Sequence, residues 1–166
     1  MPTIRHFFGG AHIAWRRSSL SWLLSTMILC MAAQVHAANL ESLDLERFKG
    51  KVVLLDFWAS WCAPCKASFP WMRHLQERYA DRDLVVIAVN LDHERSLADR
   101  FLQEQHAQFP IVFDPLGRIA ERFEVRSMPA SFYIDRAGKV RYAHAGFRSD
   151  DKADAERELA ALIAEH

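Results

Sequence analysis

The sequence of 166 residues is poor in cysteine, with only three, and contains no repeats, low-complexity tracts or long linkers. These absences argue against a repeat array or several domains, and favour one globular domain with one core. A run of apolar residues that would span a bilayer comfortably is also missing. The mostly apolar stretch 20–33 is shorter than the roughly 20 residues that a membrane helix needs.

The N-terminal part lacks acidic residues, since the first of them is Glu41. The basic residues before the apolar stretch are Arg5, Arg16 and Arg17. A basic start, a short apolar stretch and small residues up to Ala37 are typical of a secretory signal peptide that is cleaved after that residue. We therefore expect a signal peptide over 1–37 and a mature domain over 38–166 in the periplasm. The alternative is an uncleaved leader that anchors the chain in the inner membrane.

The mature part has no surplus of positive charge. It keeps all 21 acidic residues of the chain but loses the three leader arginines from the 21 basic ones, so it is mildly acidic. Proteins that bind nucleic acid need a basic surface to neutralise phosphates. The charge therefore argues against nucleic acid as a partner.

Only two cysteines, Cys62 and Cys65, remain in the mature part, because Cys30 lies in the leader. In an oxidising compartment a cysteine pair usually forms a structural disulfide. A bridge that closes so short a loop constrains the unfolded chain very little and adds little stability. The pair is therefore better suited to redox chemistry than to structural support.

Strand and helix patterns alternate along the mature part. Apolar runs and β-rich segments predict strands at 52–58, 84–91, 110–113, 131–134 and 140–144. Apolar residues at helical spacing predict helices at 63–80, 94–106, 116–123 and a last one through 155–163. Ser149 or Asp150 is the expected N-cap of the last helix.

This order of elements predicts an α/β domain of three layers, with a central mixed sheet, helices on both faces and a helical insertion. The first two strands are joined through a helix and should be parallel, with a right-handed crossover. The last two strands flank the segment 135–138, Asp-Arg-Ala-Gly, which is typical of a hairpin turn.

The two cysteines form a Cys-x-x-Cys motif where the first predicted strand ends and the long helix begins. The first turn of a helix has N–H groups without partners and a partial positive charge, both of which stabilise a thiolate. Such motifs lower the cysteine pKa from about 8.5 to roughly 3.5–7.5. We expect Cys62 to be the exposed nucleophile, and Cys65 to attack the mixed disulfide and release the partner.

A zinc site is the competing interpretation of the cysteine pair. Zinc normally takes four ligands, commonly from a second Cys/His pair, and the sequence has no second cysteine pair. Four histidines of the mature part lack ligand spacing and are interpreted as surface or satisfied residues: His74, His93, His106 and His144. We therefore expect neither a metal nor another cofactor.

The segment 53–66, Val-Leu-Leu-Asp-Phe-Trp-Ala-Ser-Trp-Cys-Ala-Pro-Cys-Lys, resembles the active-site segment of thioredoxins. The longer pattern is similar to their exported TlpA-like relatives from about Leu43 to the end. Its supporting features are Gly50-Lys51, Pro70, the helical insertion before 109–114, and Met128-Pro129 before 131–135.

The resemblance implies roles for several residues. Pro129 matches the cis-proline that lies across from the cysteines and presents backbone to a substrate strand. Asp56 matches the buried carboxylate, whose raised pKa would let it take the proton of Cys65. Trp61 is expected in the docking surface, whereas Trp58 and Trp71 are expected to be packing residues. The remaining expected substrate-binding residues are Ala63, Pro64 and Met128.

Two departures from the family pattern bear on function. Thioredoxins carry a lysine near the buried aspartate, but Ala88 stands there in our alignment, so Asp56 would lack a cationic partner and its pKa would rise further. The segment Pro129-Ala130 differs from the Gly-x-Pro-Glu segment usual in the cytochrome c maturation branch. That difference argues against this specific role.

The favoured function is a disulfide reductase of exported proteins, kept reduced by a membrane electron donor and acting as a monomer. Ala63-Pro64 resembles the Gly-Pro of reducing thioredoxins more than the Pro-His of strong oxidants, but a dithiol oxidase or isomerase stays open. A copper chaperone would need a further ligand such as His144 or Met128. A peroxidase would need one activated cysteine in its own motif.

Overall fold

The computed structural model describes residues 43–165. The predicted signal peptide and its cleavage site after Ala37 lie outside these residues. Within them, no helix combines the length and the apolar character needed to cross a membrane.

A five-stranded sheet forms the centre of the domain, with the strand order β3-β2-β1-β4-β5. Its strands are β1 (Val52–Trp58), β2 (Leu84–Asn90), β3 (Ile111–Phe113), β4 (Ala130–Ile134) and β5 (Val140–Ala145). β1 pairs with β2 in parallel and β2 with β3 in parallel, whereas β4 is antiparallel to both β1 and β5. The predicted parallel pair and the predicted hairpin are both confirmed, and the sheet is mixed as expected.

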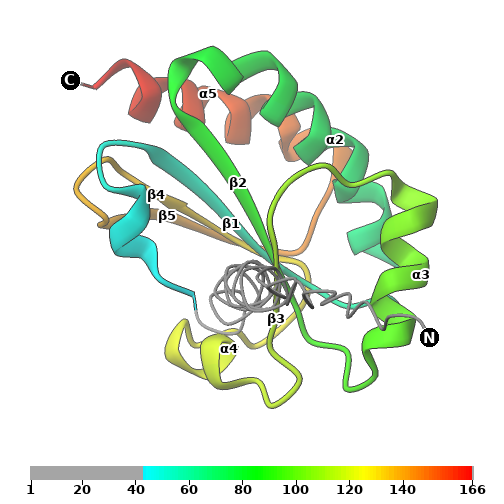
Figure 1. Cartoon of the computed structure of the whole chain (residues 1–166). Coiled ribbons are helices and arrows are strands. Elements are labelled where there is room, and N and C mark those ends of the chain that lie inside the picture. Colours follow the sequence, from blue (N-terminus) through cyan, green and yellow to red (C-terminus); the bar gives the residue numbers. More distant parts are fainter. Residues whose placement is uncertain (1–42, 166) are drawn as a thin grey trace, which may run out of the picture. The chain divides into compact units, whose positions relative to one another are not determined.

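Helices cover both faces of this sheet (Figure 1). They are α2 (Ala63–Tyr79), α3 (Arg95–Gln105), α4 (Arg118–Arg122) and α5 (Lys152–Ala164), with short 3-10 helices η1 (Leu45–Phe48), η2 (Ala80–Arg82) and η3 (Ser149–Asp151). Buried residues of α2, α3 and α5 share one apolar cluster, and those of α4 belong to a second cluster on the opposite face. The three layers and the helical insertion, α3, are thereby confirmed.

The central strand β1 supplies side chains to both apolar clusters, because successive residues of a strand point to opposite faces. All seven of its residues are buried. Leu54 and Trp58 belong to the cluster beneath α2, and Phe57 belongs to the cluster on the α4 face. Asp56 lies between Leu54 and Trp58 in this alternation, so a carboxyl group occupies the α2 face of an otherwise apolar strand.

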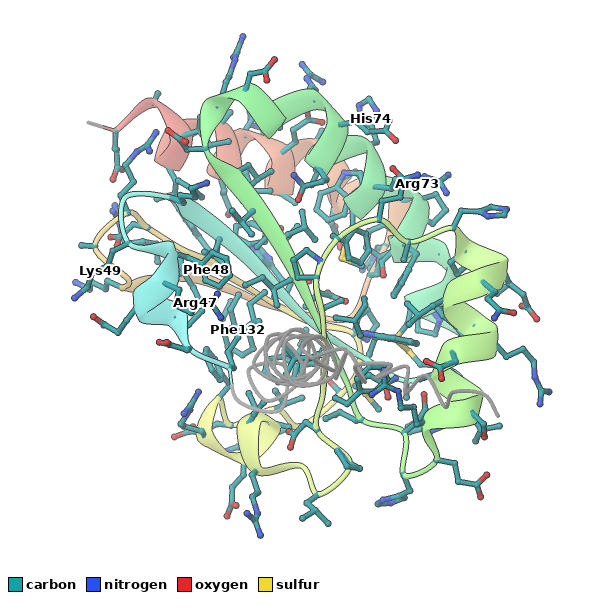
Figure 2. All side chains as sticks on the ribbon, viewed as in Figure 1. Arg47, Phe48, Lys49, Arg73, His74 and Phe132 are labelled. Atoms are coloured by element: carbon teal, nitrogen blue, oxygen red, sulfur yellow. A yellow bond between two sulfur atoms is a disulfide. The ribbon has the colours of Figure 1, made fainter. Side chains whose placement is uncertain are left out.

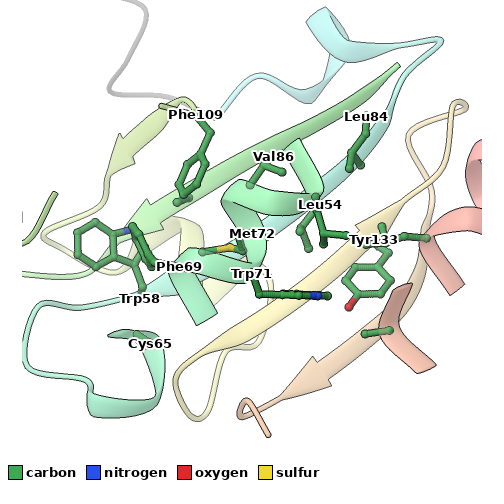
Figure 3. Packing of buried hydrophobic residues seen from close by; sticks show 14 of the residues in the cluster. Leu54, Trp58, Cys65, Phe69, Trp71, Met72, Leu84, Val86, Phe109 and Tyr133 are labelled. Atoms are coloured by element: carbon green, nitrogen blue, oxygen red, sulfur yellow. The ribbon is translucent and has the colours of Figure 1, made fainter. Parts of the chain in front are cut away.

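Aromatic rings fix α2 and α3 to the sheet. The ring centroids of Trp58, Phe69 and Phe101 lie 4.7–4.9 Å apart in all three pairs, and Figure 3 shows Trp58 and Phe69 against each other. Trp71 packs against Phe147 in a tilted arrangement, with ring centroids 5.6 Å apart. Trp58 and Trp71 are both buried, which confirms that they are packing residues.

A second group of rings fills the opposite face. Phe57, Phe123 and Phe132 pack against each other with centroids 5.1–5.7 Å apart. Figure 2 shows Phe48 and Phe132 on this side of the sheet, away from Arg73 and His74 on α2. Apolar side chains thus cover both faces of the sheet, and few polar side chains are buried between the sheet and the helices.

The start of α5 differs from the prediction, because neither Ser149 nor Asp150 is its N-cap. The cap position is Asp151, and its side chain makes no capping hydrogen bond. The 3-10 turn η3 runs directly into α5, and the N–H groups of Asp151 and Lys152 donate to the carbonyls of Arg148 and Ser149. Because backbone carbonyls already satisfy these N–H groups, no side-chain cap is required.

Candidate active site

The two cysteines of the motif lie at the N-terminal end of α2 and are joined by a disulfide with a Cα–Cα distance of 5.2 Å. The backbone N–H of Cys65 donates to Sγ of Cys62 at 3.2 Å. An N–H group of the first helical turn therefore points at the sulfur that would carry the negative charge in the reduced protein. This arrangement stabilises a thiolate on Cys62.

The prediction that Cys62 is exposed is wrong for this disulfide-bonded state, because only 5% of the residue is accessible. The bond to Cys65 and the hydrogen bond from its N–H draw the sulfur back over the helix end. Cys65 is less accessible still, at 0%. The order of accessibility therefore agrees with Cys62 as the residue that a partner reaches first.

The residues around the disulfide provide the surface that a partner would touch. Trp61 is 70% exposed, which is unusual for so large an apolar side chain. Ala63 and Pro64, between the cysteines, are also exposed. These three predicted docking residues are therefore open to solvent beside the redox pair.

The loop before the dithiol is anchored by Asp92, a residue that the sequence analysis did not single out. Its carboxylate accepts from the N–H and the hydroxyl of Ser60, both at 2.9 Å, and from the side-chain amide of Asn90 at 2.7 Å. Asp92 is 3% exposed. The sequence did contain a signal for this contact. Asp92 follows the end of β2 and Ser60 follows the end of β1, and because the two strands are parallel neighbours, both ends lie at the same edge of the sheet.

Replacing Asp92 with alanine is expected to destabilise the protein by about 2–4 kcal/mol, because it removes the acceptor of the buried Asn90 amide and of two donors of half-buried Ser60. Urea unfolding of the variant would measure this change. Asp99→Ala is a matched control, since Asp99 is exposed on α3 and makes only a surface ion pair with Arg95. Equal stability of the Asp92 variant and the parent would contradict the anchoring role.

Asp56 is buried in the middle of β1, with an exposed fraction of 1%. The hydroxyl of Ser131 donates to its Oδ1 at 2.6 Å, and Oδ2 has no hydrogen-bond partner among the described residues. Burial raises the pKa of Asp56 to about 7, against a smaller lowering by the Ser131 hydrogen bond. The side chain is thus an acid that titrates near neutral pH.

The partner of Asp56 on β2 is Ala88, as the alignment predicted. Alanine brings no charge, so the carboxyl has no cation opposite it on that strand, and the expected direction of the pKa shift is confirmed. Asp56 lies on the face of β1 that α2 covers, and the two cysteines lie at the N-terminal end of α2. The acid and the redox pair are therefore on the same side of the sheet.

The peptide bond between Met128 and Pro129 is cis, as the resemblance implied. Pro129 is buried, and its carbonyl accepts from the N–H of Gly146 at 2.7 Å. Since proline has no N–H, its own backbone has no free donor. Met128 is half-buried and packs against the apolar cluster beneath α2. A partner strand at this position would therefore meet the backbone of Met128 rather than that of Pro129.

The residues considered as metal ligands have other contacts. Within residues 43–165, no group of three or more His, Cys, Asp or Glu side chains is arranged to hold a metal ion. Nε2 of His144 pairs with Oε2 of Glu158 at 2.6 Å. His93 contacts the carbonyl of Pro115 at 2.9 Å. The interpretation of these two histidines as surface or satisfied residues is confirmed.

Comparisons with known proteins agree with this geometry. The family model described as Redoxin matches residues 30–159. The chain is 33% identical over 110 residues to the thiol-disulfide oxidoreductase ResA of Oceanobacillus iheyensis, with 66% of this chain and 56% of the relative covered. It is 31% identical over 118 residues to the ResA of Geobacillus kaustophilus, with 71% and 67% covered.

A solved structure from Chlorobium tepidum, provisionally assigned as the thiol:disulfide interchange protein DsbE, is 45% identical and superposes with a TM-score of 0.72. The match covers 74% of this chain and 86% of that one. The chain spans little more than half the length of the first curated relatives it matches. Family model, relatives and fold together show that the chain belongs to the Redoxin family, as a TlpA-like member of the thioredoxin superfamily.

Proposed function

We propose that the protein is a thiol–disulfide oxidoreductase that reduces disulfides of exported proteins. The observation that carries the proposal is the Cys62–Cys65 disulfide at the start of α2, with the N–H of Cys65 donating to Sγ of Cys62. A sulfur held at the positive end of a helix is a good thiolate, and the thiolate is the attacking species in disulfide exchange. The similarity to proteins named thiol-disulfide oxidoreductase supports the same activity.

The reaction begins with the dithiol form. The thiolate of Cys62 attacks one sulfur of the substrate disulfide, a mixed disulfide forms, and the other substrate sulfur leaves as a thiolate. Cys65 then loses its proton and attacks Sγ of Cys62, which closes the protein disulfide and releases the second substrate thiolate. Two electrons pass to the substrate, and both leaving thiolates take protons from solvent.

Asp56 is the proposed acceptor of the Cys65 proton. Burial brings its pKa to about 7, so roughly half of the carboxyl groups are charged at neutral pH. A base whose pKa lies near the operating pH combines a useful fraction in the correct form with a sufficient driving force for proton transfer. An ordinary aspartate, with a pKa near 3.9, would be a much weaker base toward a thiol.

The proposed partners are protein thiols and disulfides, because the surface at the dithiol suits a polypeptide. Exposed Trp61 offers apolar area beside Ala63 and Pro64, and Met128 offers backbone next to the cis-proline. Edge contact with extended peptide through main-chain hydrogen bonds is a common mode of recognition. The basic, then apolar, N-terminal segment supports action in the periplasm. A membrane electron donor and a monomeric state are further parts of the proposal.

The reduction potential tests the direction of the reaction. The protein is equilibrated in glutathione or dithiothreitol buffers, and the fraction of Cys62–Cys65 disulfide is measured by thiol alkylation and mass spectrometry. A value near about −270 mV, as in thioredoxin, is expected for a reductase that needs a dedicated donor. A value near about −120 mV would instead make the protein a dithiol oxidase. Failure of the pair to cycle at all would contradict both.

A further inference from the structure

Three polar side chains lie opposite one another on adjacent strands of the sheet. Asp56 on β1 is the register partner of Ser131 on β4, and Ser131 is the partner of His144 on β5. Residues directly opposite in antiparallel strands share a face, with Cβ atoms about 4.5–5.5 Å apart. The three side chains therefore form a polar row across the α2 and α5 face, from the centre of the sheet to its edge.

The two ends of the row differ in their access to solvent. Asp56 is buried, and its Oδ1 accepts from the Ser131 hydroxyl at 2.6 Å. The His144 side chain is 36% exposed, and its Nε2 lies 2.6 Å from Oε2 of Glu158 on α5. The row thus begins at a buried acid and ends at an imidazole–carboxylate pair near the surface.

A cavity of about 270 Å³ occupies the space beside Ser131 and His144. Trp71, Tyr133 and Glu158 are among its other lining residues. The indole N–H of Trp71 is buried and has no hydrogen-bond partner among the described residues, and Figure 3 shows the Trp71 and Tyr133 rings close together under α2. A polar cavity of this size has room for several waters, each of which needs two to four polar partners. Polar lining side chains such as Ser131, His144 and Glu158 could supply these partners.

We infer that Asp56 exchanges its proton with solvent through Ser131 and this cavity, with the His144–Glu158 pair at the exit. The inference rests on the proposed function, because it concerns how the acceptor of the Cys65 proton is returned to its charged form. Ser131 and the His144–Glu158 pair act through Asp56 and are positioning residues, whereas Asp56 is the group that takes the Cys65 proton in the proposed function.

In this path, the proton that leaves Cys65 reaches solvent and every group on the way returns to its starting form. Cys65 gives its proton to the Asp56 carboxylate as its sulfur bonds to Cys62. The Asp56 carboxylic acid then passes a proton to Oγ of Ser131, whose hydroxyl proton moves into the cavity and reaches His144 or Glu158 and then bulk solvent. Asp56 returns to the carboxylate and Ser131 regains its hydroxyl. When the protein disulfide is reduced again, the same steps run in reverse.

The charges around the row are compatible with this path. Ala88 faces Asp56 from β2 without charge. The N-terminal end of α2 contributes Cys62 and Cys65, whose thiols titrate in the reduced protein, and α2 itself contributes Trp71, which has no charge. Burial raises the pKa of Tyr133, so its hydroxyl stays neutral. The charged or titratable groups that line the cavity from β5, α5 and the segment between them are His144, Arg148, Asp151, Lys152, Asp154 and Glu158. These groups lie toward the exit rather than beside Asp56.

The test measures resolution of a mixed disulfide by stopped flow at about pH 6, where most Asp56 side chains start protonated and must lose their proton through the path before they can accept that of Cys65. Reduced protein reacts with dithionitrobenzoate, which releases one chromophoric thiolate when Cys62 attacks and a second when Cys65 resolves the adduct. Ser131→Ala is expected to slow the second release about tenfold or more, and to move its pH midpoint upward because Asp56 loses a hydrogen bond to its charged form. Ser131→Thr retains the hydroxyl and should restore both the rate and the midpoint.

The exit is tested with Glu158→Gln and His144→Gln, which should slow the second release and be rescued by added imidazole. Glu156→Gln is the matched control, because Glu156 lies on the same helix but contacts Tyr79 and Arg78 and does not line the cavity. Its rate should equal that of the parent. A parental rate in Ser131→Ala, or in both exit variants, would overturn the inferred path.

Two other outcomes separate this path from the proposed function. A parental second release in Asp56→Asn would remove Asp56 as the proton acceptor, and the path with it, while the redox activity of the dithiol would stand. Loss of both releases in the parent protein would overturn the proposed function itself.

Discussion

Replacing Cys65 with serine is expected to trap the protein in a stable disulfide with its substrate through Cys62. Cys62 keeps its place at the end of α2 and can still attack, but no thiol remains to resolve the adduct. Turnover of a disulfide substrate should fall by about three orders of magnitude or more, as when a nucleophile is removed from other enzymes. Non-reducing electrophoresis and mass spectrometry of the adduct would measure the trapping, and an insulin-reduction assay would measure turnover.

The matched variant is Cys62→Ser, which retains the buried Cys65 alone. Because Cys65 is fully buried in the disulfide-bonded protein, this variant should form no adduct on the same timescale. Adduct formation at equal rates in the two variants would show that the roles of the cysteines are not distinct. Adducts only in Cys62→Ser would show that the roles are reversed.

Replacing Asp56 with asparagine is expected to stabilise the protein at pH 8 by about 3 kcal/mol. The pKa of Asp56 is about 7 in the folded protein and 3.8 as an ordinary aspartate. Between these values the folded state holds a proton that the unfolded state has lost, so the free energy of unfolding falls by about 1.4 kcal/mol for each pH unit gained. Asparagine carries no charge to bury, so it avoids most of this loss.

Urea unfolding of the disulfide-bonded protein at pH 4.5, 6 and 8 would measure the effect. The parent should lose stability from pH 4.5 to pH 8, and the difference between variant and parent should grow over the same interval. Asp99→Asn is a suitable control, because Asp99 is exposed on α3 and lies outside the cavity beside Ser131. An Asp56 variant that is less stable than the parent at pH 8 would contradict burial as the cause of the pKa shift.

Much of the fold followed from local patterns. The run 52–58, apolar except for Asp56, predicted the central strand with its observed bounds, because a strand covered on both faces is apolar at nearly every position. The position of Cys62 and Cys65 at a helix start followed from where that run ends. The cis bond at Pro129 was a different case, since it followed from the resemblance, and most X-Pro bonds are trans.

The rest of the site depends on contacts between residues far apart in the sequence. The hydrogen bond from Ser131 to Asp56 arises from the register of β4 on β1, and the bond from Ser60 to Asp92 arises where β1 and β2 end together. No spacing rule along the chain fixes such registers. The low exposure of Cys62 was missed for a similar reason, because it depends on how the disulfide orients the sulfur.

Ala88 has a consequence for the conditions under which the protein works. With only a methyl group opposite Asp56 on β2, no cation on that strand holds the acid in one charge state, and the acidity of the surrounding medium sets it instead. Below about pH 7 the charged fraction falls roughly tenfold per pH unit. If the protein acts in the periplasm, as proposed, the rate at which it completes each exchange would follow the acidity of that compartment.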